Sequence, residues 1–369
     1  MLAGFNITYL DRRNIQGDYF NDTVTVAGRA VQSQQLGLAL RSVRGTGIMG
    51  LGFAANVAAG TPYPTVVDNM VRQGLIDAPT FSLYLNDVDA KSGTILFGGI
   101  DSQKYVGNLV SLPLLPVAAG TGSSSPGADG SANNITTYSV RLEGVSVRSG
   151  AGGSGYGLDG LGLGNMDARA ILDSGSTITL LPDALVGRIH RALGVRAVDG
   201  VAAPLVDCAW RRARGAGTSF DFDFGAGLVV RVPARYMVVD AFPPEVQQPL
   251  RDSDLGRYFR AWDGVCVFGI ASAYDYGIAS DRFALLGDTF LRSAYVVYDM
   301  ANRQLAIAPA NPNSDRSSIV AVRKNDKNLP NVTGVSPKES ASTSLPCSGP
   351  AAIAALLLFL LLPALAAAL

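Results

Sequence analysis

The interpretation of this sequence depends on one stretch, Ala170-Ile171-Leu172-Asp173-Ser174-Gly175-Ser176-Thr177. An apolar run, typical of a buried strand, leads directly into a carboxylate, and a hydroxyl, a glycine and a second hydroxyl follow. Burial raises the pKa of a carboxyl group, whereas hydroxyl and backbone N–H donors in a tight turn stabilise its ionised form. Such a group can exchange a proton near working pH, which suits acid–base catalysis. A plain β-turn is the other interpretation, because Asp and Gly are common turn formers.

Composition narrows the class of protein. The 369 residues have a mass of 38.4 kDa and are 48% apolar, enough to build the cores of about two or three domains. Lys plus Arg and Asp plus Glu each number 30, so no net charge attracts nucleic acid and no nucleic-acid partner is expected. One histidine and three cysteines are too few for a zinc site of the His/Cys type, so no metal or cofactor is expected and carboxylates must carry any chemistry. The 42 glycines and the short alternating apolar runs predict a mainly β fold.

The first part of the chain predicts antiparallel strands and one helix. The predicted strands are residues 5–9, 23–26, 34–40, 81–85, 93–97 and 109–112, with turns at Gly17 and Gly28. The apolar run at 48–53 predicts a buried strand that another backbone approaches closely, because it contains two glycines. A short helix is expected between Pro64 and Gly74, where apolar residues recur at helical spacing.

The second part repeats this pattern, again with one helix. Strands are predicted at 138–142, 145–148 and 170–172, and the helix at 182–193. The stretches 117–135 and 150–164 are rich in Gly, Ser and Ala and are predicted to be loops, because they offer little apolar surface to bury. Cys208 and Cys266 form an even pair that suits a disulfide in an oxidising compartment, and two free buried thiols are the alternative.

The end of the chain has the composition of an anchor signal. Residues 351–369 carry no charged side chain, include a proline and lack a basic residue after them, which favours a glycosylphosphatidylinositol (GPI) signal. Ser340-Ala341-Ser342 supplies small residues before a short spacer, so Ser340 is the expected attachment site. A retained C-terminal transmembrane helix is the alternative. Residues 311–350 are polar and are expected to form a solvated stalk with the GPI spacer.

Two features concern the route of the chain through the cell. Sequons that permit N-glycosylation in the secretory route occur at Asn6, Asn21, Asn134 and Asn331. After Met1 no charged segment followed by a long apolar core is present, so no export signal is found. A GPI signal without an export signal is inconsistent, and the chain is therefore expected to lack its true beginning.

Around Asp173 the sequence resembles the second active-site motif of pepsin-like aspartic proteases, and further motifs agree in order. The segments that resemble the family are 5–9 at the start of the flap, 45–53 and 92–101 in the first lobe, and 285–292 and 298–309 in the second. Cys208 and Cys266 stand where the disulfide of the second lobe is found. Together with the tail, the resemblance points to the GPI-anchored fungal branch of yapsins and candidapepsins.

The resemblance implies a mainly β, bilobal pepsin-like acid protease fold whose first lobe is incomplete. It divides the chain into an incomplete N-terminal lobe with the flap (1–116), a low-complexity linker (117–135), a C-terminal lobe with the Asp173 motif (136–310), a polar stalk and GPI spacer (311–350), and a hydrophobic GPI-signal tail (351–369). It also implies a monomer that acts on peptide or protein substrates at the extracellular face of the plasma membrane or in the cell wall.

In that family two aspartates, one from each lobe, share a proton and activate the water that attacks the peptide carbonyl. By resemblance, Asp173 is the second of these two acids. The resemblance assigns supporting roles to Ser174, which would bond across the lobes, Ser176, which would bond the carboxylate, Gly175 and Thr177 in the same turn, and Tyr9, which would close over the substrate from the flap.

The sequence departs from the family pattern at one decisive place. Asp173-Ser174-Gly175 is the only Asp-Thr/Ser-Gly triplet, so the first catalytic aspartate is absent from these 369 residues. Leu10-Asp11-Arg12-Arg13 also stands where the flap usually has small residues. Two hypotheses follow: a secretory, anchored aspartic endopeptidase of which this chain is a truncated form, or a catalytically inactive surface or cell-wall binding protein that keeps the fold.

Other patterns are interpreted as structural. The glycines at 45, 47 and 50 fit G-x-G-x-x-G, but a strand rather than a helix is predicted next, so no nucleotide site is expected. Arg211, Arg212 and Arg214 predict a solvated basic loop. His190 is expected at the surface or in packing, and Asp288, after Gly287, as a structural carboxylate.

Overall fold

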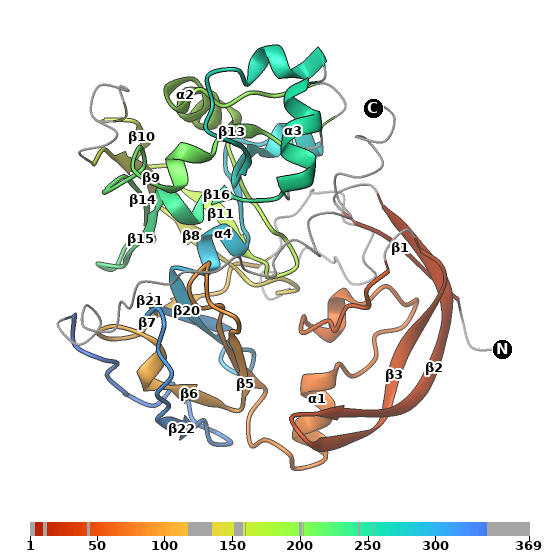
Figure 1. Cartoon of the computed structure of the whole chain (residues 1–369). Helices are drawn as coiled ribbons and strands as arrows, with labels where there is room; N and C mark the ends of the chain where they lie inside the picture. Colours follow the sequence, from red (N-terminus) through yellow and green to blue (C-terminus); the bar gives the residue numbers. More distant parts are fainter. Residues whose placement is uncertain are drawn as a thin grey trace.

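Strands dominate the computed structural model, which confirms the predicted mainly β class (Figure 1). It describes residues 4–9, 13–42, 45–116, 135–150, 158, 160–198, 201, 203–242, 244–252 and 254–337. Residues 117–134 of the predicted linker, which include the sequon residue Asn134, lie outside these residues, as do the attachment residue Ser340 and the apolar tail. Within the described ranges, no helix is both long and apolar enough to cross a lipid bilayer.

The first sheet is a long curved antiparallel ribbon in the order β1-β2-β3. It contains β1 (Gly4–Thr8), β2 (Asn14–Val26) and β3 (Arg29–Arg41). The turn predicted at Gly28 is confirmed, because Ala27 and Gly28 both have the positive φ that a two-residue hairpin needs. The turn predicted at Gly17 is wrong. Gly17 lies within β2 at an irregular register, and a Cβ there would stand 1.9 Å from the Leu38 carbonyl oxygen.

A five-stranded antiparallel sheet joins the two parts of the chain. Its order is β5 (Thr94–Phe97), β4 (Thr80–Tyr84), β20 (Ala294–Asp299), β21 (Gln304–Pro309) and β7 (Val110–Pro113). We call residues 4–116 the first half and residues 135–310 the second half, so β20 and β21 are second-half strands within a sheet of first-half strands. The Phe81 and Tyr298 rings stack across β4 and β20 with centroids 4.5 Å apart, and Tyr138 packs edge-on against both. The halves therefore share one apolar core.

The second half contains three further sheets. A mixed sheet has the order β18 (Ile270–Ser272), β12 (Thr179–Leu181), β19 (Phe283–Leu286), β11 (Ala168–Leu172) and β8 (Ser139–Leu142). An antiparallel sheet has the order β10 (Gly162–Leu163), β9 (Gly144–Arg148), β14 (Ser219–Asp223) and β15 (Val229–Pro233). A small sheet has the order β13 (Leu205–Asp207), β17 (Val265–Phe268) and β16 (Val238–Val239).

Both predicted helices are confirmed. They are α1 (Val66–Arg72), which a Thr65 capping box begins, and α2 (Asp183–Leu193), which ends at Gly194 with φ +70°. Figure 1 shows α1 on the concave side of the β1–β3 sheet. The expectation of one helix in the second half is wrong, because α3 (Pro244–Asp252) and the short α4 (Asp288–Leu291) also form. Two prolines obscured α3 in the sequence, and the burial of its Leu250 beside Phe242 and Phe259 stabilises it.

The buried strand predicted at residues 48–53 is wrong. No strand forms there, and the Ile48 side chain is 58% exposed. An apolar run becomes a strand only where another strand lies beside it, and none of the described strands pairs with this segment. Its far end is nevertheless fixed to the second half, since the Tyr138 hydroxyl donates to the Leu51 carbonyl oxygen at 2.6 Å and the Tyr138 ring contacts Phe53.

The solvated stalk expected from residue 311 is also wrong for residues 311–337, which we call the strap. The strap runs back over the first half, where β22 (Ile319–Ala321) pairs with β6 (Gly99–Asp101). Tyr105 donates through its hydroxyl to the Val332 carbonyl oxygen at 2.6 Å, and the backbones of residues 106 and 335 are bridged. Composition misled because the apolar residues of the strap are few, although Val322 and Val335 are buried.

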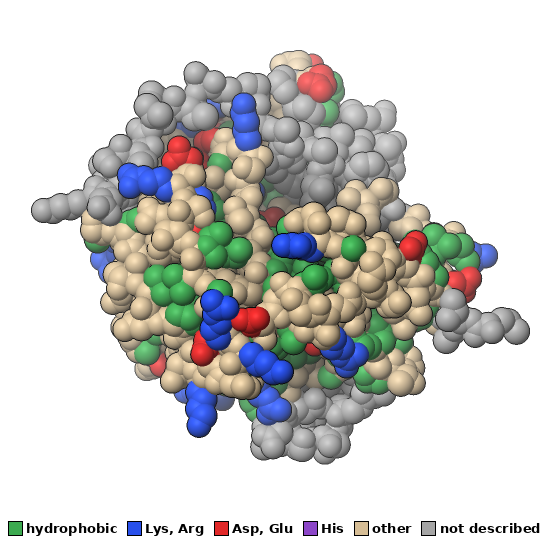
Figure 2. Space-filling view, turned by 90° about the horizontal axis from the view of Figure 1, so that it is seen from below, with side chains coloured by type: hydrophobic (Ala, Val, Ile, Leu, Met, Phe, Trp, Pro, Cys, Tyr) green, Lys and Arg blue, Asp and Glu red, His purple; other side chains and the backbone are tan. Residues whose placement is uncertain are grey.

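Charge is mixed rather than segregated on the side of the molecule that includes the strap. Seen from below, this face shows Lys and Arg side chains scattered singly or in small groups, several of them beside Asp or Glu (Figure 2). On the strap itself Arg323 pairs with Asp77 at 3.0 Å. Among the described residues, this face therefore shows no continuous basic surface of the kind that binds polyanions.

Packing of the strap gives a stability prediction. Val322 is 2% exposed and Ile319, on the same strap, is 59% exposed. Val322→Ala should lower the free energy of unfolding by about 1–3 kcal/mol, because it leaves a cavity, whereas Ile319→Ala should change it by less than about 0.5 kcal/mol. Urea denaturation followed by tryptophan fluorescence measures both. Equal effects of the two substitutions would show that the strap does not pack in solution.

Candidate active site

β11 positions Asp173 at the end of a buried strand. Ala170 and Leu172 point into the core, and β11 runs parallel to β19 on one side and antiparallel to β8 on the other. The ladder continues for one more bond, in which the Asp173 N–H donates to the Leu286 carbonyl oxygen at 3.1 Å. The backbone of Asp173 is thus held by the sheet, while its side chain is only partly buried. A carboxylate fixed in this way at a strand end can face a ligand.

A tight turn holds both oxygens of the Asp173 carboxylate. The Gly175 N–H donates to Oδ1 at 2.9 Å, and the Ser176 hydroxyl donates to Oδ2 at 2.7 Å. Gly175 leaves room for this approach, because a Cβ there would stand 3.0 Å from Oδ1, a tight contact. Together the two hydrogen bonds fix the plane of the carboxylate.

The first turn of α4 clamps this turn from below. The Asp288 N–H donates to the Ser176 carbonyl oxygen at 2.8 Å, and the Thr289 N–H donates to the Thr177 carbonyl oxygen at 3.2 Å. Gly287 permits the contact, since a Cβ at that position would lie 2.4 Å from the Ser176 carbonyl oxygen. The pairing of β11 with β19 therefore brings two acidic side chains, those of Asp173 and Asp288, to one edge of the sheet.

Asp288 was expected as a structural carboxylate, and what sequence reasoning did not predict is its raised pKa. Burial raises the pKa of Asp288 to about 7, the positive charge of Arg292 acts against this, and the negative charge of Asp173 adds to it. Tyr298 lies beneath both acids, and burial together with both carboxylates raises the pKa of its hydroxyl. The signal was present in the sequence, because Leu285-Leu286-Gly287-Asp288 repeats the pattern of an apolar strand that ends in an acid.

The other predicted site residues are placed as follows. Ser174 is exposed at the tip of the turn, and the bond it was predicted to make across the halves is not formed with any described residue. Tyr9 follows β1 and packs beside Phe5, Ile15 and Tyr19. The sequon residues Asn6, Asn21 and Asn331 are exposed. The Asn6 side chain accepts a hydrogen bond from Asn14 at 2.5 Å.

The predicted Cys208–Cys266 disulfide is present, with an S–S distance of 2.01 Å. It joins the start of a short 3₁₀ helix, η4 (Cys208–Arg211), to β17, and so staples the small β13-β17-β16 sheet. The alternative of two free thiols is thereby excluded in this structure.

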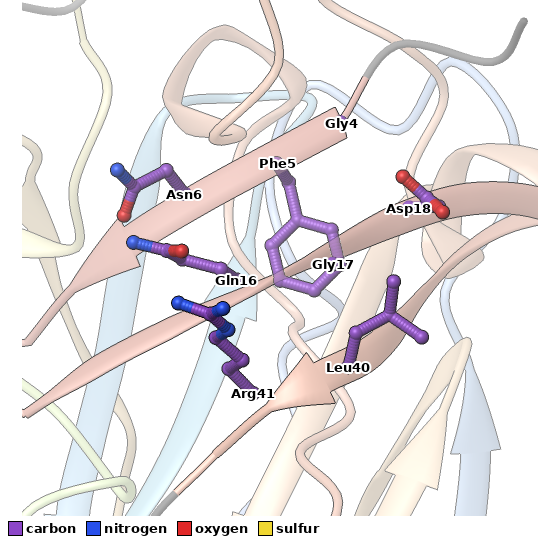
Figure 3. Close-up of a pocket in the computed structure, with 8 residues that line it drawn as sticks. All are labelled: Gly4, Phe5, Asn6, Gln16, Gly17, Asp18, Leu40 and Arg41. Atoms are coloured by element: carbon purple, nitrogen blue, oxygen red, sulfur yellow. The ribbon is translucent and has the colours of Figure 1, made fainter.

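A pocket of about 390 Å³ lies elsewhere, on the β1–β3 sheet. Figure 3 shows the Phe5 ring at its centre over Gly17, with one acidic and one basic side chain, Asp18 and Arg41, at its rim. It contains a single carboxylate and none of the residues of the Asp173 turn. The pocket therefore does not include the carboxylate turn at Asp173.

A family model for "Eukaryotic aspartyl protease" matches residues 2–310 of the chain. The chain belongs to the eukaryotic aspartyl protease family. Within this family it is 33% identical over 339 residues, 90% of this chain and 61% of the relative, to the probable aspartic-type endopeptidase opsB of Aspergillus fumigatus. It is 30% identical over 321 residues, 86% of this chain and 63% of the relative, to the secreted aspartic protease 4 of Candida albicans.

The fold is that of the same family. The aspartic proteinase from Irpex lacteus superposes on the chain with a TM-score of 0.57 at 21% identity, covering 85% of this chain and 83% of that one. This confirms the predicted pepsin-like fold. The chain spans about three fifths of the length of the first fungal relatives it matches, and the strap follows the range that the family model matches.

The raised pKa of Asp288 gives a prediction with a definite sign. Below about pH 4 its carboxyl is protonated in both the folded and the unfolded chain, so Asp288→Asn should leave stability unchanged. Between about pH 4 and pH 7 the unfolded chain ionises first, so the parent loses stability as pH rises and the variant does not. Above pH 7 the variant should be more stable by about 2–4 kcal/mol.

Thermal or urea unfolding at pH 4 and pH 8 measures this difference. Asp223→Asn is the control, because it makes the same substitution at an exposed aspartate, the last residue of β14, which accepts a hydrogen bond from the Gly225 N–H at 2.9 Å. It should not stabilise the protein at pH 8. Identical stabilities of the parent and Asp288→Asn at pH 8 would contradict the raised pKa of Asp288.

Proposed function

We propose that the protein is an aspartic endopeptidase and that Asp173 supplies one of the two carboxylates that activate the attacking water. The observation that carries the proposal is the turn that holds both Asp173 oxygens through Gly175 and Ser176 while its side chain stays partly open to a ligand. Family membership of the chain supports the same reaction class. The activity is proposed for the whole protein, because the chain spans about three fifths of its first relatives.

The geometry supports a definite division of labour. In the ionised form, Asp173 accepts the proton of a bound water, and the resulting hydroxide adds to the carbonyl carbon of the peptide. A second carboxyl group, protonated at that moment, donates its proton to the carbonyl oxygen. Collapse of the tetrahedral intermediate, with proton transfer to the amide nitrogen, then breaks the C–N bond. The donors Gly175 and Ser176 hold both Asp173 oxygens in place for the first step.

The second carboxylate of the reaction cannot be assigned from a motif in this sequence. The sequence contains one Asp-Ser-Gly triplet and no Asp-Thr-Gly, so a second acid of the same kind is not among these 369 residues. Asp288 does not replace it, because its main chain serves as the floor of the Asp173 turn and its pKa of about 7 reflects burial. We therefore propose that the second acid belongs to a part of the whole protein that this sequence does not contain, and that it faces Asp173 from the side of the first half.

We further propose that the protein passes through the secretory route and is held at the cell surface by a GPI anchor at Ser340, as in the yapsin-like branch. Support comes from the apolar end of the sequence, from the disulfide, which forms in oxidising compartments, and from the exposed sequons Asn21 and Asn331. Peptide or protein substrates outside the cell, and action as a monomer, complete this proposal.

Proteolysis of casein at acid pH by the whole protein tests the reaction. The parent should cleave, a statine-type transition-state mimic should inhibit it, and Asp173→Ala should lower the rate at least about 1000-fold, because it removes the base. Asp223→Ala is the matched control, since it removes a carboxylate with the same local turn geometry, and should retain activity. Full cleavage by Asp173→Ala would refute the assignment. A folded parent without activity would favour the inactive surface-binding protein.

Phospholipase treatment of intact expressing cells tests the anchor. A phosphatidylinositol-specific phospholipase C should release the protein into the medium, and Ser340→Leu, which places a bulky side chain at the attachment site, should prevent surface display. Retention in the membrane after phospholipase treatment, with an uncleaved tail found by mass spectrometry, would instead establish the transmembrane alternative.

A further inference from the structure

One loop of the first half reaches into the second half with two carboxylates. It spans residues 86–91 and follows β4 directly, where β4 pairs with β20. Asn86 has a φ of +68°, and its side-chain oxygen accepts from the Asp87 N–H at 2.7 Å and from the Tyr84 hydroxyl at 2.8 Å. This local bonding fixes the loop so that the Asp87 side chain is directed inward and is 3% exposed. A buried carboxylate of this kind needs strong partners.

The partners of Asp87 come from the other half. Arg235 and Tyr236, both in the 3₁₀ helix η5 (Ala234–Tyr236), donate to the same oxygen of Asp87, the tyrosine hydroxyl at 2.8 Å. The other oxygen accepts from the Asp89 N–H at 3.0 Å. Burial alone would raise the pKa of Asp87, but the Asp89 N–H, Tyr236 and Arg235 together hold it below its usual range. Asp87 is therefore a fully partnered anion at the junction of the halves.

A second ion pair widens the contact. Arg211, at the end of η4, donates to an Asp89 oxygen at 2.6 Å, and Arg235 lies 3.5 Å from the other. This corrects the prediction of a solvated basic loop, because Arg214 is also paired, with Asp207 at 2.7 Å. The disulfide begins at Cys208, the first residue of η4, so the covalent staple holds the helix that carries Arg211.

The same loop contacts the residue that follows α4. Arg292 donates from its guanidinium to the Asp87 carbonyl oxygen at 3.3 Å, and its backbone N–H donates to the Asp288 carbonyl oxygen at 3.1 Å. The groups that act on the Asp288 carboxyl are the positive charge of Arg292 and the negative charge of Asp173, and Tyr298 packs beneath. A continuous set of contacts therefore runs from the first half to the floor of the Asp173 turn.

We propose that Asp87, Asp89, Arg211, Arg235, Tyr236 and Arg292 form a latch between the halves that positions the Asp173 turn for reaction. This inference rests on the proposed function. Its members are positioning residues and touch no substrate. If the second acid lies across the halves, the separation of the two carboxylates depends on the placement of one half on the other, and misplacement by about 1 Å costs catalysis heavily. A buried, multiply bonded carboxylate fixes that placement, whereas exposed ion pairs would not.

The second half contains a matched control for the latch. Asp221 is also 3% exposed, and it accepts from Arg148 and Arg231 at 2.6–3.0 Å and from Ser219. All of these residues belong to the β9, β14 and β15 strands of one sheet. Asp87→Asn and Asp221→Asn therefore remove chemically similar carboxylates, and only the first lies between the halves.

Hydrogen–deuterium exchange of the full chain tests the latch without requiring catalysis. In Asp87→Asn, amides of residues 86–91, 234–237, 288–292 and 173–177 should exchange at least about tenfold faster, because the contact opens more often. In Asp221→Asn, faster exchange should be confined to β9, β14 and β15. Unchanged exchange at 173–177 in a folded Asp87→Asn would overturn the proposal.

A charge exchange keeps the test decisive if Asp87→Asn does not fold. Asp89 and Arg211 have side chains that are 37% and 22% exposed, so substitutions there are tolerated better than at Asp87. Asp89→Arg and Arg211→Asp should each speed exchange at 173–177, and the double variant should exchange more slowly than either single variant, because it restores the 89–211 ion pair although Arg235 then faces a positive charge. A double variant whose residues 173–177 exchange as fast as in the single variants would overturn the latch.

Titration of Asp288 and peptide cleavage show whether the latch acts on the site, and whether it fails independently of the proposed function. Carbon-13 titration of the Asp288 carboxyl should give a higher midpoint in Arg292→Gln and in Asp87→Asn, but not in Asp221→Asn, because the nearby positive charge is lost or displaced. If exchange and titration respond as stated and the whole protein cleaves no peptide, the proposed function fails and the latch stands. If Asp173→Ala abolishes cleavage while Asp87→Asn changes neither readout, only the latch fails.

Discussion

The parallel pairing of β11 with β19 is the constraint on which the site depends. It brings the ends of two buried strands to one edge, where each strand delivers an acidic residue, Asp173 from one and Asp288 from the other. Backbone bonds from the start of α4 then close the Asp173 turn from below. Glycine is required at 287, where the backbones approach more closely than a side chain allows, and Gly175 leaves room for the carboxylate. Chemistry at Asp173 is thus a consequence of sheet geometry.

The two acids of this edge are held differently. Both oxygens of Asp173 accept hydrogen bonds within its own turn, from the Gly175 N–H and the Ser176 hydroxyl. Burial raises the pKa of Asp288 to about 7, and the main chain of Asp288 supports the Asp173 turn. Asp288 therefore has a structural place in the site, and the Asp173 carboxylate is the group left to face a ligand.

The sequence predicted an element correctly where its structure depends on residues near it in the chain. The helices at α1 and α2, the hairpin at Gly28 and the strand before Asp173 were predicted correctly, because periodicity and turn residues report local structure. Ile48 and Val322 were misjudged for one reason: an apolar residue is buried only if something covers it, and sequence does not say what does. Ile48 lacks a described neighbouring strand, whereas Val322 finds one by folding back on β6.

The sequence predicted the Asp173 turn but not the long-range contacts around it. The Asp-Ser-Gly-Ser run predicted Asp173, Gly175 and Ser176, since the hydrogen bonds to the Asp173 carboxylate come from within four residues. Asp288 contacts Ser176, and Arg211 contacts Asp89, each more than 100 positions away in the chain. The sequence therefore indicated a structural carboxylate and a solvated basic residue at these two positions. Long-range pairing of charges has no local pattern to detect.

The most direct test of the central claim is a crystal structure of the whole protein with a statine-type peptide inhibitor bound. The account predicts that the inhibitor hydroxyl lies within about 3 Å of an Asp173 carboxylate oxygen and displaces the water there. An inhibitor seated in the pocket over Phe5, with Asp173 untouched, would contradict it.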